Sequence, residues 1–207
     1  MKRPPKIAFD KAMDQIDNMK AIHSYLETSA KNLDASAILR AQLLLAVSAV
    51  DTYLHAAVSD VLHQKFFQGQ GGLLEKSRIR LDFGCQLFHA KSLQEQEEIF
   101  DIAIKEAQSQ KAYQAPRLIE EAMSLLGVKH LWSRIAKKEN KKAKDIWDQM
   151  SVIIFRRNQI AHESDFDFVT MQLRPANARE FGEAVDFLRR FVDDVDALIY
   201  GEDDGSA

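Results

Sequence analysis

Hydrophobic residues recur at intervals of three and four along most of the chain, which is the spacing of one face of an α-helix. The alternation of hydrophobic and polar residues that is typical of a β-strand never continues beyond four or five positions. The pattern predicts helices over about 7–29, 35–67, 93–109, 116–126, 130–138, 145–162 and 176–200. A further short helix is predicted within 73–90, where Gly84 weakens the pattern. The chain is therefore predicted to be all-α.

Residues that favour helix ends support several of these boundaries. Asp34 and Ser36 are candidates for the N-cap of the second helix, and Ser92 with Glu95 three positions later forms a capping-box pattern. Pro116 suits the first turn of a helix, and Gly127 suits the residue after a helix end. None of these boundaries marks a break between domains, and no internal repeat is visible.

The most apolar segment, residues 43–50, predicts that the second helix is the central one, because this segment is apolar nearly all round. It is too short to span a bilayer, so no membrane partner is expected. Asp51 follows directly, and a carboxylate beside a core is costly unless it is paired. We consider two interpretations: Asp51 pairs with Arg157 or His162 as a supporting acid, or it faces solvent.

Composition narrows the class of protein further. The chain has 207 residues, 46% of them hydrophobic, with four Pro and eight Gly. These values predict a single domain over 1–207 with a substantial core and a frayed acidic tail at 201–207. The formal net charge of −3 excludes a globally basic nucleic-acid coat, so any phosphate site must be local.

The cysteine and histidine content argues against disulfides and metal sites. The lone cysteine, Cys85, excludes an intramolecular disulfide and a cysteine-based zinc site. The six histidines show no metal-ligand spacing, and no cofactor is expected. The basic start is followed by no apolar run of signal-peptide length, so we expect a soluble, cytoplasmic protein.

The predicted helix over 145–162 ends in a cluster of polar residues that can carry chemistry. Arg157 continues the apolar stripe of this helix, and a guanidinium cannot be left unpaired in a core. Arg157 therefore needs a carboxylate, a phosphate or a boundary with another subunit. Asn158 and His162 are four residues apart and so share one face of the helix.

This ending resembles the signature of the HEPN superfamily (higher eukaryotes and prokaryotes nucleotide-binding). In that family an Arg, usually followed by a polar residue such as Asn, lies a few residues before a His near a helix end. Arg157, Asn158 and His162 fit this pattern, whereas Arg156 lacks the polar follower. The segment from Asp51 to His55 is similar to an acidic and aromatic element in the central helix of the group linked to RiboL-PSP.

The resemblance implies a fold and an activity. The fold is an all-α, up-and-down helical bundle of four core helices with additional short helices, commonly a homodimer. The activity is metal-independent cleavage of RNA by attack of its own 2′-hydroxyl. His162 would transfer protons, Arg157 would hold the scissile phosphate, and Asn158 would orient the His or donate to phosphate. Family members also pair with an antitoxin or a nucleotidyltransferase, in toxin–antitoxin or defence systems.

A basic segment precedes this helix and has two interpretations. It is a phosphate-steering patch that contacts RNA through counterion release, or a solvated loop. Its lysines are Lys137, Lys138, Lys141, Lys142 and Lys144.

Two alternatives to the ribonuclease stay open at this point. The first is a non-catalytic HEPN-like module that binds a nucleotide or a protein. The second is an unrelated helical scaffold in which Arg157 forms an internal salt bridge with Asp51.

Overall fold

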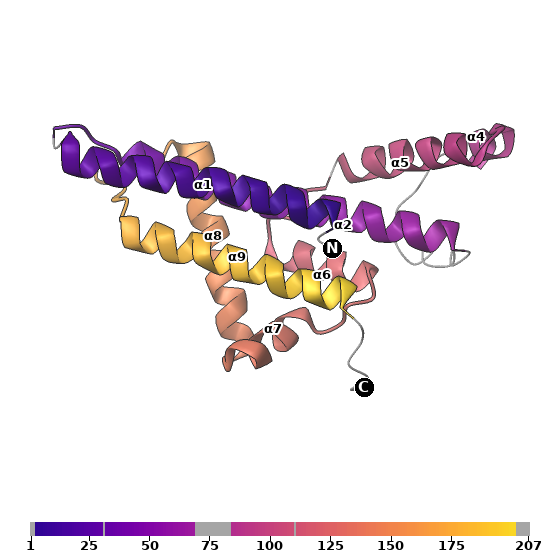
Figure 1. The fold of residues 1–207 in the computed structure, drawn as a ribbon. Helices are drawn as coiled ribbons and strands as arrows, with labels where there is room; N and C mark the ends of the chain where they lie inside the picture. Colours follow the sequence, from indigo (N-terminus) through magenta and orange to yellow (C-terminus); the bar gives the residue numbers. More distant parts are fainter. Residues whose placement is uncertain (1–2, 31, 69–83, 110, 202–207) are drawn as a thin grey trace.

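The computed structural model describes residues 3–30, 32–68, 84–109 and 111–201. Within them the chain forms a helical bundle with one short β-hairpin (Figure 1). The helices are α1 (Pro4–Ser29), α2 (Ser36–Phe67), α4 (Gly84–His89), α5 (Leu93–Ser109), α6 (Pro116–Leu125), α7 (Leu131–Glu139), α8 (Ala143–Glu163) and α9 (Ala178–Tyr200). The strands are β1 (Phe166–Asp167) and β2 (Gln172–Leu173). The predicted all-α class is confirmed. Of the predicted features, the first part of the short helix, 73–83, and the tail from 202 lie outside the described residues.

Several helix ends follow the local signals in the sequence. α2 differs, because Ser36 is its first residue and the N-cap position holds Ala35, which has no side-chain cap; the Ser36 amide donates to the Asp34 carboxylate at 2.9 Å. The Ser92 hydroxyl accepts a hydrogen bond from the Glu95 amide at 3.1 Å, and the Glu95 carboxylate accepts one from the Lys91 amide. Pro116 occupies the first turn of α6. Gly127 follows α6 with a φ of +92°, a conformation that favours glycine.

α2 lies at the centre of the bundle and contacts α1, α5, α6, α8 and α9. Leu54, Ala57 and Val58 on this helix have no exposed surface. The Tyr53 hydroxyl donates to the Asp196 carboxylate of α9 at 2.9 Å, which satisfies a polar group inside the core. Burial, together with this carboxylate, raises the pKa of Tyr53. The prediction of a central buried helix is therefore confirmed.

α2 is also long and apolar enough, by length and composition alone, to cross a membrane. Half of its most apolar stretch is buried in the protein, and a core helix passes the same test.

α8 crosses the long helices instead of running along them (Figure 1). It begins at its contact with α7 and ends beside the first turns of α2, where Arg40 reaches the residues that follow α8. Ile146, Met150 and Ile153 bury one face of the helix. This crossing determines which residues surround the end of α8.

A β-hairpin follows α8, in the interval between the predicted helices over 145–162 and 176–200. Phe166 pairs with Leu173, and Asp167 pairs with Gln172, in an antiparallel register. Each strand has two residues, which is too short for an alternating pattern to be recognised. The Arg174 amide donates to the Asp165 carbonyl at 2.8 Å, which closes the base of the hairpin.

Candidate active site at the end of α8

The last turns of α8 present Arg157, Asn158 and His162. His162 is exposed, and no hydrogen bond or ion pair holds its imidazole among the residues that the structure describes. Arg157 is partly buried, and its guanidinium donates to the Asn158 carbonyl oxygen at 3.1 Å. The Arg157 Nε is buried without an acceptor. The His162 imidazole is therefore accessible to solvent, and the Arg157 guanidinium has a buried donor without an acceptor.

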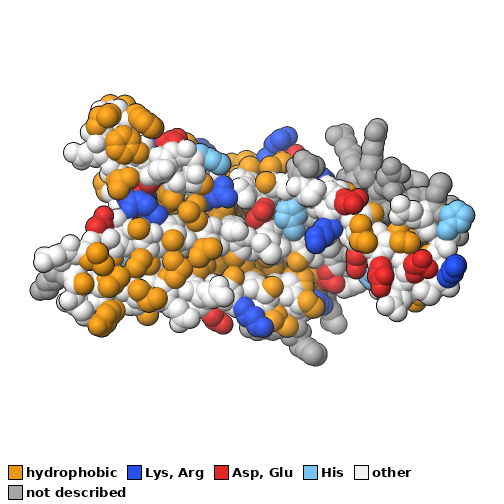
Figure 2. Space-filling model, turned by 90° about the horizontal axis from the view of Figure 1, so that it is seen from above, with side chains coloured by type: hydrophobic (Ala, Val, Ile, Leu, Met, Phe, Trp, Pro, Cys, Tyr) orange, Lys and Arg blue, Asp and Glu red, His pale blue; other side chains and the backbone are white. Residues whose placement is uncertain are grey.

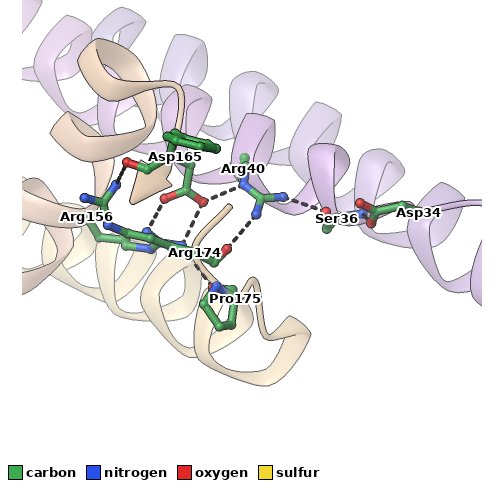
Figure 3. A network of polar contacts seen from close by, with 8 residues as sticks. Asp34, Ser36, Arg40, Arg156, Asp165, Arg174 and Pro175 are labelled. Carbon is green, nitrogen blue, oxygen red and sulfur yellow. Dashed lines mark hydrogen bonds and ion pairs between the residues drawn. The ribbon is translucent and has the colours of Figure 1, made fainter. Parts of the chain in front are cut away.

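The neighbouring Arg156 is in a different situation. Both of its terminal nitrogens donate to the Asp165 carboxylate, which is fully buried (Figure 3). Arg40 of α2 donates its Nε to the same carboxylate at 2.5 Å. Two guanidiniums thus enclose one buried acid, the arrangement that a buried carboxylate needs.

Backbone carbonyls complete this network. Arg40 donates to the Arg174 carbonyl at 2.7 Å, and Arg156 donates to the Pro175 carbonyl at 3.0 Å (Figure 3). Arg174 in turn pairs with Glu163 at 2.8 Å. The network joins α2, α8 and the segment that leads into α9.

The two adjacent arginines therefore differ in charge balance. Arg156 is neutralised by Asp165, whereas no carboxylate lies within ion-pair distance of Arg157 in the described part of the chain. Of the three partners that the sequence allowed for Arg157, an internal carboxylate is not the one found. A phosphate and a subunit boundary remain.

Asp51 is not part of this site, which corrects one expectation. Its carboxylate accepts from the Tyr113 amide at 2.6 Å and lies 3.8 Å from the His55 imidazole on the same helix. No hydrogen bond or ion pair joins it to Arg157 or His162 among the described residues. Asp51 is occupied by the segment between α5 and α6, so the salt bridge of the scaffold alternative does not form.

The basic segment lies at the opposite end of α8 from His162. Lys144 and His162 are separated by about 27 Å along a helix with a rise of 1.5 Å per residue. Lys138 pairs with Asp194 at 3.0 Å, and Lys141 pairs with Glu139 at 2.5 Å. Part of the positive charge expected here is therefore balanced within the chain.

Hydrophobic side chains are exposed beside His162. On α8, Val152 is 67% exposed and Phe155 is 65% exposed, and both recur at helical spacing with His162. The hairpin adds Phe168, Val169, Met171 and Leu173, each more than half exposed. In Figure 2 hydrophobic side chains gather in the left half of the view, at the end of the molecule where α1 leads into α2. We use the term apolar patch for six residues, Val152, Phe155, Phe168, Val169, Met171 and Leu173.

The comparison with known families identifies the chain. A family model described as RiboL-PSP-HEPN matches residues 14–201, which include all of α2 and α8. The chain belongs to the RiboL-PSP-HEPN family. No curated protein and no solved structure matches it.

Membership in RiboL-PSP-HEPN confirms the resemblance inferred from Arg157, Asn158 and His162. Within the described residues, no group of three His, Cys, Asp or Glu side chains could hold a metal ion.

Sequence reasoning missed the residues around Asp165 in this HEPN chain. Arg40 carried the one available signal, because it is a charged residue at the edge of an apolar segment and so requires a partner. The partner lies 125 residues away, and no local pattern connects the two.

Replacing Arg156 and replacing Arg157 should have different effects on the free energy of unfolding. Arg156→Ala leaves the buried Asp165 with one guanidinium, and we expect the free energy of unfolding to fall by about 3 kcal/mol. Arg157→Ala removes no ion pair, and we expect a loss of about 1 kcal/mol or less. Urea unfolding followed by circular dichroism measures both. Equal losses in the two variants would contradict this division between the arginines.

Proposed function

We propose that this HEPN domain is a metal-independent endoribonuclease. The observation that carries the proposal is that the end of α8 holds both an exposed His162 imidazole and an Arg157 guanidinium with no carboxylate partner among the described residues. A guanidinium keeps its charge at every physiological pH and matches a phosphate with two donors. An unperturbed imidazole gives and takes protons near neutral pH.

The chemistry follows from these two groups. His162 removes the proton from a ribose 2′-hydroxyl, whose oxygen forms a bond to the adjacent phosphorus while the bond from phosphorus to the 5′-oxygen breaks. The leaving 5′-oxygen takes up a proton, so the products are a 2′,3′-cyclic phosphate and a 5′-hydroxyl. Arg157, oriented by Asn158, stabilises the charge that develops on the phosphate. The proposal restricts the substrate to RNA, because DNA lacks the nucleophile.

A second copy of the chain would supply the second proton-transfer group. One imidazole per chain is exposed at this site, and cleavage needs both a base and an acid. The apolar patch lies beside His162, and a two-fold axis through it would bring the two α8 ends together. Large exposed hydrophobic residues next to a functional side chain are typical of an interface. We therefore include a homodimer in the proposal.

The homodimer is tested by one charged substitution. Phe155→Lys places a charge within the apolar patch, and we expect it to convert the dimer into a monomer. Ile102→Lys on α5 is the matched control, because Ile102 is 59% exposed and lies outside the patch. Light scattering at micromolar concentration reports the mass. If the parent protein is already a monomer, a second copy does not supply the second proton-transfer group and the homodimer is excluded.

The lysines before α8 are proposed as a sequence-independent RNA contact. Lys137 and Lys142 make no ion pair in the described part of the chain, and Lys144 is 83% exposed. Residues 129–148 carry seven Lys or Arg and three Asp or Glu, although the whole chain has a net charge of −3. RNA bound at His162 would have to extend along α8 to reach them.

The salt dependence of RNA affinity tests this contact. Replacing Lys137, Lys142 and Lys144 by Gln should reduce the slope of log affinity against log salt by up to about 2, since each lost single-strand phosphate contact contributes about 0.7. The same replacements at Lys11, Lys20 and Lys111, which are exposed elsewhere, should leave the slope near the parent value. If the two triple variants give identical slopes, the lysines do not contact RNA and the segment is a solvated loop.

Cleavage is tested on the full-length protein. We expect RNA cutting that persists in chelator and stops when the cleaved nucleotide carries a 2′-deoxy ribose. His162→Ala should slow cleavage by about 10²–10⁴-fold, the usual contribution of a general acid or base. Circular dichroism on the same samples should show an unchanged fold, because His162 is exposed and makes no hydrogen bond or ion pair in the described structure.

The control for this experiment is His89→Ala, which removes an exposed histidine from α4. If folded His162→Ala cuts RNA as fast as the parent, a non-catalytic nucleotide- or protein-binding module replaces the enzyme. The role in a toxin–antitoxin or defence system is part of the same proposal, because the resemblance that assigns the catalytic roles also implies an antitoxin or nucleotidyltransferase partner.

A further inference from the structure

Asp165 combines a buried charge with an unusual backbone three residues after His162. Its carboxylate has no exposed surface, and its φ is +58°, next to Ser164 with a φ of +51°. Left-handed conformations are unfavourable for residues other than glycine, and two in succession persist only where the surroundings hold them. The Asp165 side chain provides that hold through Arg40 and Arg156.

The backbone of Asp165 completes the last turn of α8. Its amide donates to the Gln159 carbonyl at 3.0 Å, which ends the helix, and its carbonyl accepts from the Arg174 amide at 2.8 Å, which begins the return of the hairpin. His162 lies inside this closed turn, between Gln159 and Glu163. Glu163 is itself paired with Arg174.

No hydrogen bond or ion pair of its own determines the position of His162 among the described residues. Its imidazole makes no hydrogen bond with any residue that the structure describes. Its place relative to Arg157 therefore depends on the backbone of the last helical turn. That turn is fixed to α2 through Arg40, which also donates to the Ser36 hydroxyl at 2.6 Å (Figure 3).

We propose that Asp165 is a positioning residue for the reaction: held by Arg40 and Arg156, it fixes the turn that aims His162 at a phosphate bound by Arg157. This inference rests on the proposed ribonuclease function. Arg156 then belongs to the scaffold of the site and Arg157 to its chemistry. Misplacement of a reacting group by about 1 Å can reduce a rate by roughly 10²-fold, so such a clamp has a large effect on catalysis.

The experiment compares Asp165→Asn with Asp17→Asn in the full-length protein. Asp17 of α1 accepts both of its 2.9 Å hydrogen bonds from Arg189 of α9 at the surface, so the control removes an Arg–Asp pair that includes no residue of α8 or of the Asp165 network. We expect folded Asp165→Asn to lose roughly 10²-fold in kcat, with KM for RNA changed by less than about two-fold, because Arg157 is untouched. The control should match the parent in both constants.

A second measurement does not depend on cleavage. In a protein with labelled histidines, the His162 ring signal is assigned by its loss in His162→Ala. We expect it to shift or broaden in Asp165→Asn and to be unchanged in Asp17→Asn. If Asp165→Asn does not fold, the same two measurements are made on Arg40→Gln. In that variant Asp165 still pairs with Arg156.

The outcomes are distinct. An unchanged kcat together with an unchanged His162 signal in a folded variant overturns the positioning role. A parent protein that does not cut RNA overturns the proposed function, while the ring signal still decides whether Asp165 fixes His162. A loss that appears in KM and not in kcat also overturns the proposal, because it would place Asp165 in RNA binding.

Discussion

A carboxylate that is removed from water has to be neutralised by nearby cations, and Asp165 imposes this requirement on the whole end of α8. Arg40 and Arg156 satisfy it from two different helices. Because both guanidiniums also donate to backbone carbonyls around Arg174 and Pro175, the same interaction fixes the hairpin and the approach to α9. The geometry around His162 follows from this one neutralised charge.

The same requirement separates two adjacent arginines that look equivalent in the sequence. On an α-helix consecutive residues point about 100° apart, so Arg156 and Arg157 face different surroundings. Arg156 faces Asp165 and lies over the Phe181 ring, where its charge is used within the fold. Arg157 faces no carboxylate in the described structure, so its charge is not balanced by an ion pair there. Arg156 lies outside the family motif of Arg157 and His162, but its pairing with Asp165 holds the end of the helix that carries the motif.

α8 also separates two kinds of residue along its length. Its first turn follows the lysine-rich segment, its middle carries Val152 and Phe155 of the apolar patch, and its last turn carries His162. A rigid helix of 21 residues keeps the two ends about 30 Å apart, so RNA contacts at both ends would require an extended strand. In the proposed dimer the apolar patch joins the two chains, while the lysines stay at the outer ends.

The sequence by itself determined the helices and the Arg157–His162 motif, because helical periodicity, caps and motif spacing are local properties of the chain. α2, α5 and α6 begin and end close to their predicted limits for this reason. Tertiary structure alone decided what lies around the motif. The Arg40–Asp165 pair spans 125 residues, the hairpin is too short to leave a pattern, and Asp51 pairs with Tyr113 because of how the segment after α5 returns to α2. Such contacts depend on the packing of distant segments, which no local spacing encodes.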